Sequence, residues 1–521
     1  MLKILQSEKR EPYSGEKFWA DLKAGTIGFA SAMPIVMALG ILSGIGPVAG
    51  LHCFIIVGLV AALLGGARML VSGPSVAMAV IVSTILADNG GDLAELAIIA
   101  VMAGGMQVLL GVFGIGRFVS YLPHIVMAGF LSGIGVRILW AQAVRIFPAG
   151  MDDVAIVSLS LAVMLVWPKK MERYVPGPLA GVGSGILLSL FLPGAVLLGE
   201  VPTGLPVPII SMPTIGVLAG AVGPASLLAL ISTGYTLMLA VTADTFTGGQ
   251  HNSNRQLVSL GVANITAGLV GTMPGSGNLA TLTIIRFGGR TVVAGIITAL
   301  LLAALLAFLG PYVSWIPVAA LSAVILRVGL TVIEWGFLRR ILTIRTDFVA
   351  VMLTTMALAL FLDPLMAVIF GVIAANAINA DRLEQLELDS VISVPLLDSV
   401  FLKIEDENDP FRARAGLLEF RGAFTVASSR KLVRMIGDDI REHDLVIFDL
   451  SELRHMDDSS AHLVSLLIDR ARQSRTEVVF VGIPEKVREV FDAFDVLRQV
   501  PAERIVDTRD DARELAVRIL N

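Results

Sequence analysis

Two short polar segments interrupt long apolar stretches of this sequence. One is SGPS at positions 72–75, followed by VAMAVIVSTILA, and the other is PGSGN at 274–278, followed by LATLTII. We expect each segment to start a helix of half the usual membrane-spanning length. Because both segments are small and free of acidic residues, they would present backbone N–H groups and the positive end of a helix dipole. Together they predict a site for an anion midway across a bilayer.

The composition places most of the chain in a membrane. Of 521 residues, 55% are hydrophobic and 16% are charged, and the mean hydropathy is +0.80. Positions 174–254 contain no Lys or Arg, whereas the sequence after about position 397 mixes acidic and basic residues as soluble domains do. The chain therefore joins a membrane region, with the lipid bilayer as its solvent, to a soluble domain.

Other classes of chemistry find little support. The single cysteine, Cys53, excludes a disulfide within the chain, and the six histidines lack metal-binding spacing. The sequence has no nucleotide-binding loop or nucleophile elbow, and its net charge of −5 argues against a nucleic-acid partner. We expect no enzyme activity, no metal site and no cofactor. The polar N-terminus does not fit a cleaved secretory signal and is expected to be a cytosolic arm.

Twelve apolar runs are long enough to cross a bilayer as helices. They lie near 24–46, 51–67, 95–115, 120–142, 153–168, 179–197, 220–243, 257–272, 292–311, 315–333, 346–362 and 364–380. Together with the two half-length helices, these runs make fourteen segments. Because fourteen is even, we expect both termini on the same side of the membrane. Except for Arg145, the basic loop residues fall on that side, which the positive-inside rule makes the cytosol. A bacterial cytoplasmic membrane is the expected location.

The half-length helices occupy equivalent places in the two halves of the chain. They are the third and tenth segments, so each is the third member of a run of seven. Equivalent breaks of this kind indicate an inverted repeat with its binding site at the interface between the repeats. Because seven is odd, the second run enters the membrane upside down, and the two half-length helices approach from opposite sides.

The C-terminal region has the pattern of a small α/β domain. Runs 445–450 and 478–482 have the composition of buried strands, while 459–474 and 485–494 have helical spacing. The predicted organisation is a cytosolic arm at 1–20, a membrane domain at 21–382, a linker at 383–396 and the α/β domain at 397–521.

Several of these motifs resemble one family of membrane proteins. The stretches TADTFTGGQHNSNRQLVSLGVANITAGLVGTMPGSGN (242–278) and FGGRTVVAGIITALLLAALLAFLGPYVSWIPVAALSAVILRVGLTVIEW (287–335) are similar to the SulP (sulfate permease) family, in its bacterial branch with bicarbonate transporters. The tail, with FDLSELRHMDDSSA, resembles the family's STAS domain. The resemblance implies two inverted seven-segment repeats, a core and a gate domain, elevator-like transport of an anion, and a homodimer.

The resemblance also implies where the substrate binds. The site would lie between the starts of the third and tenth segments and beside the eighth. The residues at these places are Gly73, Pro74, Ser75, Val76, Tyr235, Gly277, Asn278 and Leu279. Five of them have a structural alternative: the two glycines could only permit close packing, Ser75 and Asn278 could only cap helices, and Tyr235 could only fill the core.

The sequence departs from the sodium-coupled relatives at the places that would bind the cation. Tyr235, Leu239 and Leu279 stand where those relatives carry an aspartate and two threonines, so we expect no sodium coupling. Thr281 stands where many members carry an arginine, and Arg327 is predicted to lie at the membrane interface. The site is therefore expected to hold its anion without a fixed positive charge.

Asp458 and Ser459 are the candidate regulatory residues of the tail. STAS relatives of the anti-sigma antagonist type phosphorylate a serine after an aspartate, and Asp458 occupies that place here, with Ser459 as the alternative. A permanent carboxylate would imitate the phosphate charge. Positions 457–459 could instead only cap the following helix, and a cytosolic protein partner of this domain stays open.

The function favoured by the sequence is secondary transport of a small inorganic or carboxylate anion, in the class of sulfate, bicarbonate, chloride and dicarboxylates. Two alternatives stay open. A symporter of neutral solutes such as nucleobases would share the fold, although it would typically carry carboxylates in the eighth and tenth segments and lack a STAS tail. A sensor or scaffold that no longer transports would act through its STAS domain.

Overall fold

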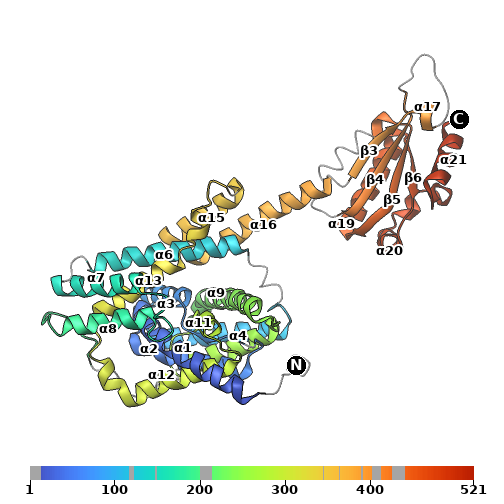
Figure 1. The fold of residues 1–521 in the computed structure, drawn as a ribbon. Coiled ribbons are helices and arrows are strands. Elements are labelled where there is room, and N and C mark those ends of the chain that lie inside the picture. Colours follow the sequence, from blue (N-terminus) through green and yellow to red (C-terminus); the bar gives the residue numbers. More distant parts are fainter. Residues whose placement is uncertain are drawn as a thin grey trace. The chain divides into compact units, whose positions relative to one another are not determined.

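A computed structural model describes most of the chain. The described residues are 13–67, 69–116, 123–146, 150–199, 214–343, 345–362, 364–388, 391–401, 412–424 and 440–521. They form two compact units, Met1–Ile373 and Ala374–Asn521 (Figure 1). The first unit is helical apart from two very short strands, and the second is built on a five-stranded sheet.

A helix lies in each of the fourteen predicted segments. These helices are α1 (Gly15–Leu42), α2 (Pro47–Leu64), α3 (Val76–Asp88), α4 (Leu93–Val112), α6 (His124–Ile146), α7 (Met151–Val166), α8 (Gly177–Ser189), α9 (Ile215–Thr247), α10 (Ser253–Leu269), α11 (Ala280–Arg286), α12 (Val292–Val313), α13 (Val318–Val332), α15 (Thr346–Phe361) and α16 (Pro364–Leu388). A further short helix, α14, spans Trp335–Leu338. Within the described residues, six helices are long and apolar enough to cross a membrane, and the number of crossings stays a prediction.

The helices of the first unit pack in two groups. In one group α4 packs against α9 and α10, α1 packs against α2 and α12, and α2 packs against α10 and α12. In the other, α13 packs against α6, α7 and α8, and α6 packs against α15. Helix α1 also contacts α8 and α13, so it lies where the two groups meet. A ligand held between the groups would therefore contact both.

Small residues let α4 and α10 approach closely. A Cβ atom on Gly104 would lie 2.5 Å from the carbonyl oxygen of Gly261, and one on Gly268 would lie 2.7 Å from that of Ala97. Only glycine permits these backbone distances, which are typical of helix pairs in membranes. The pair forms part of the wall behind the two half-length helices.

The segments before α3 and α11 meet as two strands. Strand β1 (Ser72–Gly73) pairs antiparallel with β2 (Ser276–Gly277), in the register Ser72 with Gly277 and Gly73 with Ser276. All four residues are buried. The chain therefore enters the two half-length helices in opposite directions from one point, as an inverted repeat requires.

The second unit confirms the expected α/β domain. Its sheet has the order β3 (Val391–Leu396), β4 (Ala415–Phe424), β5 (Leu445–Met456), β6 (Glu477–Val481) and β7 (Ile505–Val506). The β3–β4 pair is antiparallel and the other pairs are parallel. The described part of this unit also contains the helices α17 (Asp398–Phe401), α19 (Asp458–Ser474), α20 (Glu485–Ala493) and α21 (Arg509–Leu520) and two short 3₁₀ turns. Strand β3 lies in the stretch expected as a linker, and the domain boundaries stay predictions.

Asp21 in α1 fixes the start of α12. Its side chain is fully buried and accepts hydrogen bonds from the backbone N–H groups of Arg290 (2.7 Å) and Thr291 (3.1 Å) and from the Thr291 hydroxyl. The nearby ion pair of Arg290 with Glu16, in contrast, is exposed.

We predict that Asp21→Ala lowers the free energy of unfolding by about 2 kcal/mol, because it removes a buried carboxylate that accepts from two backbone N–H groups and a hydroxyl at the start of α12. Denaturant unfolding in detergent micelles measures this. Glu16→Ala is the matched control and should cost less than about 1 kcal/mol, as exposed ion pairs do. Equal losses in the two variants would show that Asp21 does not hold α12.

Candidate anion-binding site

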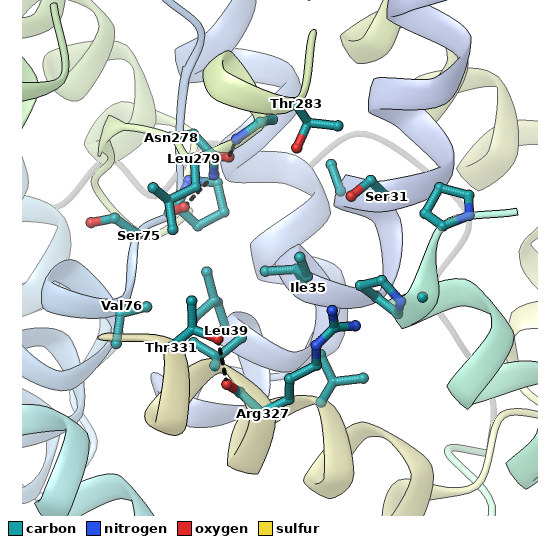
Figure 2. A pocket seen from close by; sticks show the side chains of 18 of the residues that line it. Ser31, Ile35, Leu39, Ser75, Val76, Asn278, Leu279, Thr283, Arg327 and Thr331 are labelled. Carbon is teal, nitrogen blue, oxygen red and sulfur yellow. Dashed lines mark hydrogen bonds between the residues drawn. The ribbon is translucent and has the colours of Figure 1, made fainter. Parts of the chain in front are cut away.

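A pocket of about 240 Å³ lies between the two groups of helices. Its volume would admit a small anion together with several waters, each of which takes about 30 Å³ in the liquid. One wall carries Ser75, Asn278 and Leu279 at the starts of the half-length helices, and α13 forms the opposite wall (Figure 2). Between them, α1 contributes residues 31, 35 and 39, whose spacing of four puts them on one helix face.

Six of the eight predicted site residues line this pocket. They are Pro74, Ser75, Val76, Tyr235, Asn278 and Leu279. Tyr235 reaches it from α9 and is 8% exposed. The site therefore draws on α3, α9 and α11, as the sequence predicts, while their role in binding stays a prediction.

Gly73 and Gly277 lie behind the pocket wall. A Cβ atom on Gly73 would lie 2.8 Å from Cδ2 of Phe54. The N–H of Gly277 already donates to Oγ1 of Thr236 at 2.7 Å. Of the two roles considered for these glycines, the geometry supports close packing rather than direct contact with a ligand.

Side chains join the starts of the two half-length helices. The Ser276 hydroxyl donates to Oγ of Ser75 at 2.6 Å, and Nδ2 of Asn278 donates to the carbonyl oxygen of Pro74 at 2.6 Å. Oδ1 of Asn278 accepts from the N–H of Ala280 at 2.8 Å. Asn278 thus bridges α3 and α11 and also caps α11.

The two helix starts differ in how many N–H groups they leave open. At α11, the N–H groups of Asn278, Ala280 and Thr281 bond to Val71, to the Asn278 side chain and to the Asn278 carbonyl, and within the described structure the Leu279 N–H finds no acceptor. At α3, Ser75 accepts from Met78 at 3.4 Å, and within the described structure the N–H groups of Val76 and Ala77 find no acceptor. The start of α3 is therefore the stronger donor to an anion.

A buried polar network holds the loop before β2 in place. The side chain of Asn264 in α10 accepts from the N–H of Gly275 (2.8 Å) and donates to its carbonyl (3.1 Å). Gln107 in α4 accepts from Asn264 at 2.9 Å, and Ser232 in α9 donates to the Gly275 carbonyl at 2.8 Å. Sequence reasoning missed these positioning residues, although amide side chains within apolar runs are a usable signal.

The pocket also carries charge, which the sequence analysis did not expect. Glu172, Arg286 and Arg327 are the charged residues among the described lining. Arg286 donates to Glu172 at 3.0 Å. Arg327 lines the pocket from α13 (Figure 2). The pocket therefore has fixed positive charge in its lining, while the expectation about the anion site itself stays a prediction.

Comparison with known proteins identifies the family of this chain. The model of the sulfate permease family matches residues 18–153 and 149–355, and the STAS domain model matches 408–512. The chain belongs to the sulfate permease family. It is 29% identical to the bicarbonate transporter BicA of Synechocystis, over 95% of this chain and 94% of that protein. It is 26% identical to the putative sulfate transporter YvdB of Bacillus subtilis, over 96% and 98%.

Solved structures show the same fold in other proteins. The transmembrane domain of a cyanobacterial BicA matches with a TM-score of 0.63 at 28% identity, covering 69% of this chain and 98% of that chain. The structure of SLC26A9 matches with a TM-score of 0.83 at 17% identity, covering 98% and 91%. The expected fold, a helical membrane transporter with a STAS domain, is confirmed.

The predicted regulatory residues of the STAS domain begin α19. Asp458 and Ser459 are its first two residues, and their side chains lie outside the described part of the structure. The preceding Asp457 caps the helix by accepting from the N–H of Ser460 at 2.8 Å. A regulatory role for Asp458 or Ser459 stays a prediction.

We predict that the double variant Ser75→Cys with Ser276→Cys forms a disulfide on mild oxidation, because the two hydroxyl oxygens lie 2.6 Å apart and a disulfide needs about 2.05 Å between sulfurs. Mass spectrometry after alkylation in denaturant should show two fewer reactive thiols than in the reduced protein. Each single variant controls for the native Cys53 thiol, which is buried. Full alkylation of the oxidised double variant would show that the helix starts do not meet.

Proposed function

We propose that this protein is a secondary transporter of a small inorganic or carboxylate anion, acting by elevator-type alternating access. The observation that carries the proposal is the meeting of the α3 and α11 starts at one pocket, with the N–H groups of Val76 and Ala77 unpaired in the described structure. A helix start with unpaired N–H groups attracts an anion through hydrogen bonds and the helix dipole. Membership of the sulfate permease family supports it, as do relatives named as bicarbonate and sulfate transporters.

The two helix groups support an elevator mechanism. The helix starts that would hold the anion belong with α9 and α1 in one group, while α8 and α13 of the other group close the far side of the pocket. Sliding of the first group along the second would carry the bound anion across the bilayer. We propose the group of α6, α7, α8, α13 and α15 as the gate.

We further propose that transport does not depend on sodium. A sodium ion needs several oxygen ligands at short distance, as other hard cations do. Leu239 and Leu279 offer only hydrocarbon, and Leu239 instead packs near Gly277, whose added Cβ would lie 3.1 Å from Cδ2 of Leu239. Thr236, one position after Tyr235, uses its Oγ1 as an acceptor for the Gly277 N–H.

The proposal also includes the location of the protein, its oligomeric state and the role of its STAS domain. We propose a bacterial cytoplasmic membrane as the location, with both termini in the cytosol. We propose a homodimer, as the family resemblance implies. The STAS domain would then serve folding, dimer contact or regulation by a cytosolic protein partner.

We predict that purified protein in liposomes exchanges at least one anion among bicarbonate, sulfate, chloride, nitrate and a dicarboxylate. Counterflow with radiolabelled anions measures the exchange. Replacement of Na⁺ by K⁺ on both sides should leave the rate unchanged within about twofold, since the site lacks a cation cage. Counterflow of none of these anions would refute the transporter proposal, and strong sodium dependence would refute only its sodium-independent part.

We predict that Val76→Pro raises the half-saturation concentration for the transported anion about tenfold. Proline deletes the Val76 N–H, and a hydrogen bond to a charged group is worth about 1.5 kcal/mol. The helix should tolerate the change, because Val76 is its first residue and follows the extended Ser75 (φ −125°, ψ 164°).

Two variants control for the other effects of this proline. Val292→Pro makes the same change at the first residue of α12, after the extended Thr291 (φ −142°, ψ 170°) and outside the pocket. Val76→Ala shortens the side chain and keeps the N–H. Both should transport with nearly unchanged half-saturation. A normal half-saturation in Val76→Pro would show that this N–H does not bind the anion.

A further inference from the structure

Arg327 contributes an unpaired cation to the pocket wall. Its Nη1 atom is buried and has no hydrogen-bond partner within the described structure. The guanidinium lies against Gly177, where an added Cβ would be 2.8 Å from Nη1 and 3.5 Å from Nη2. Figure 2 shows the Arg327 side chain directed from α13 towards the face of α1 that carries Ile35. The absence of a side chain at Gly177 makes room for this arrangement.

This position is unfavourable for a cation in the absence of an anion. Gly177 is the first residue of α8, and the start of a helix carries the positive end of its dipole. The helix dipole does not stabilise an arginine at that end. An unpaired charge within a membrane protein also raises the free energy of the folded state. The packing of α8 and α13 therefore gives no structural reason for the charge.

The other charged groups of the pocket do not neutralise Arg327. Glu172 is near enough to attract it, but the Glu172 carboxylate accepts from Nη1 of Arg286 at 3.0 Å. Two arginines and one glutamate line the described pocket, so their formal charges leave one positive charge. Val76 lines the same cavity.

We propose that the transported anion is an oxyanion and that Arg327 is a specificity-determining residue for it. Two N–H donors of the guanidinium would bind two oxygens of the anion. The proposal rests on the transport function proposed above and narrows its substrate class. A guanidinium is a planar fork whose donors match two oxygens of a bicarbonate, sulfate or carboxylate group. A halide offers a single centre, for which the ammonium group of lysine serves as well. Arg327 thus favours oxyanions over chloride.

The test compares Arg327→Lys, Arg327→Met and wild type in proteoliposomes. The readouts are the half-saturation concentration for the transported oxyanion and the preference for oxyanion over chloride, measured by flux and by chloride inhibition of oxyanion uptake. In Arg327→Lys we expect the half-saturation concentration for the oxyanion to rise about tenfold and the preference for oxyanion over chloride to fall by a similar factor. The reason is that lysine keeps the positive charge but lacks the two-pronged guanidinium. In Arg327→Met we expect weaker binding of both anions.

The matched control is Arg345→Gln, which removes an arginine outside the pocket that pairs with Asp347 at the surface. It should behave as wild type. An unchanged half-saturation and an unchanged oxyanion preference in Arg327→Lys, with wild type transporting normally, would overturn the role of Arg327 alone. Failure of wild type to move any anion would overturn the transport function itself. If Arg327→Met aggregates on size exclusion, the Lys variant, which keeps the charge and most of the stem, decides.

Discussion

The antiparallel pairing of two buried Ser-Gly dipeptides is the constraint on which the rest of the membrane unit depends. Backbone groups outside a helix must find partners in an apolar interior, because no water is there to satisfy them. Strands β1 and β2 pair with each other, and the Gly277 N–H donates to the Thr236 hydroxyl. The pairing makes α3 and α11 start close to one another. A Cβ atom on Gly275 would lie 2.7 Å from the carbonyl oxygen of Gly73, so the pairing depends on glycine.

The pairing also decides how the site can attract an anion. Because the chain around α11 uses Asn278 and Val71 to satisfy its own N–H groups, the donors left open belong mainly to α3. The other source of positive potential comes from across the pocket, where Arg327 stands beside the start of α8. In the proposed site, N–H donors at the start of α3 belong to one helix group and Arg327 belongs to the other. Sliding of the groups would separate them and so couple anion binding to the transport state.

Much of this arrangement could be predicted from the sequence. The breaks at 72–75 and 274–278 were visible because small polar residues stood out within apolar runs, and their equivalent places in two halves of seven segments predicted that they meet. The alternation of strand-like and helix-like runs after position 397 predicted the α/β domain, because the periodicity of a short stretch of sequence indicates its secondary structure.

The missed features depend on contacts between distant parts of the chain. Whether a helix start is open or capped depends on partners such as Val71 for Asn278 and Thr236 for Gly277, which no local pattern reveals. Arg327 resembles an interfacial arginine in sequence, because it lies near the end of an apolar run. The Arg327 side chain instead fits into the space beside Gly177, which lies 150 positions earlier in the chain.

The most direct test of the central claim is a pair of cryo-electron microscopy maps, recorded with and without a saturating concentration of the anion that wild-type protein transports. The account predicts difference density in the pocket, within hydrogen-bonding distance of the N–H groups of Val76 and Ala77. Difference density elsewhere in the membrane unit, with this position unchanged, would contradict it.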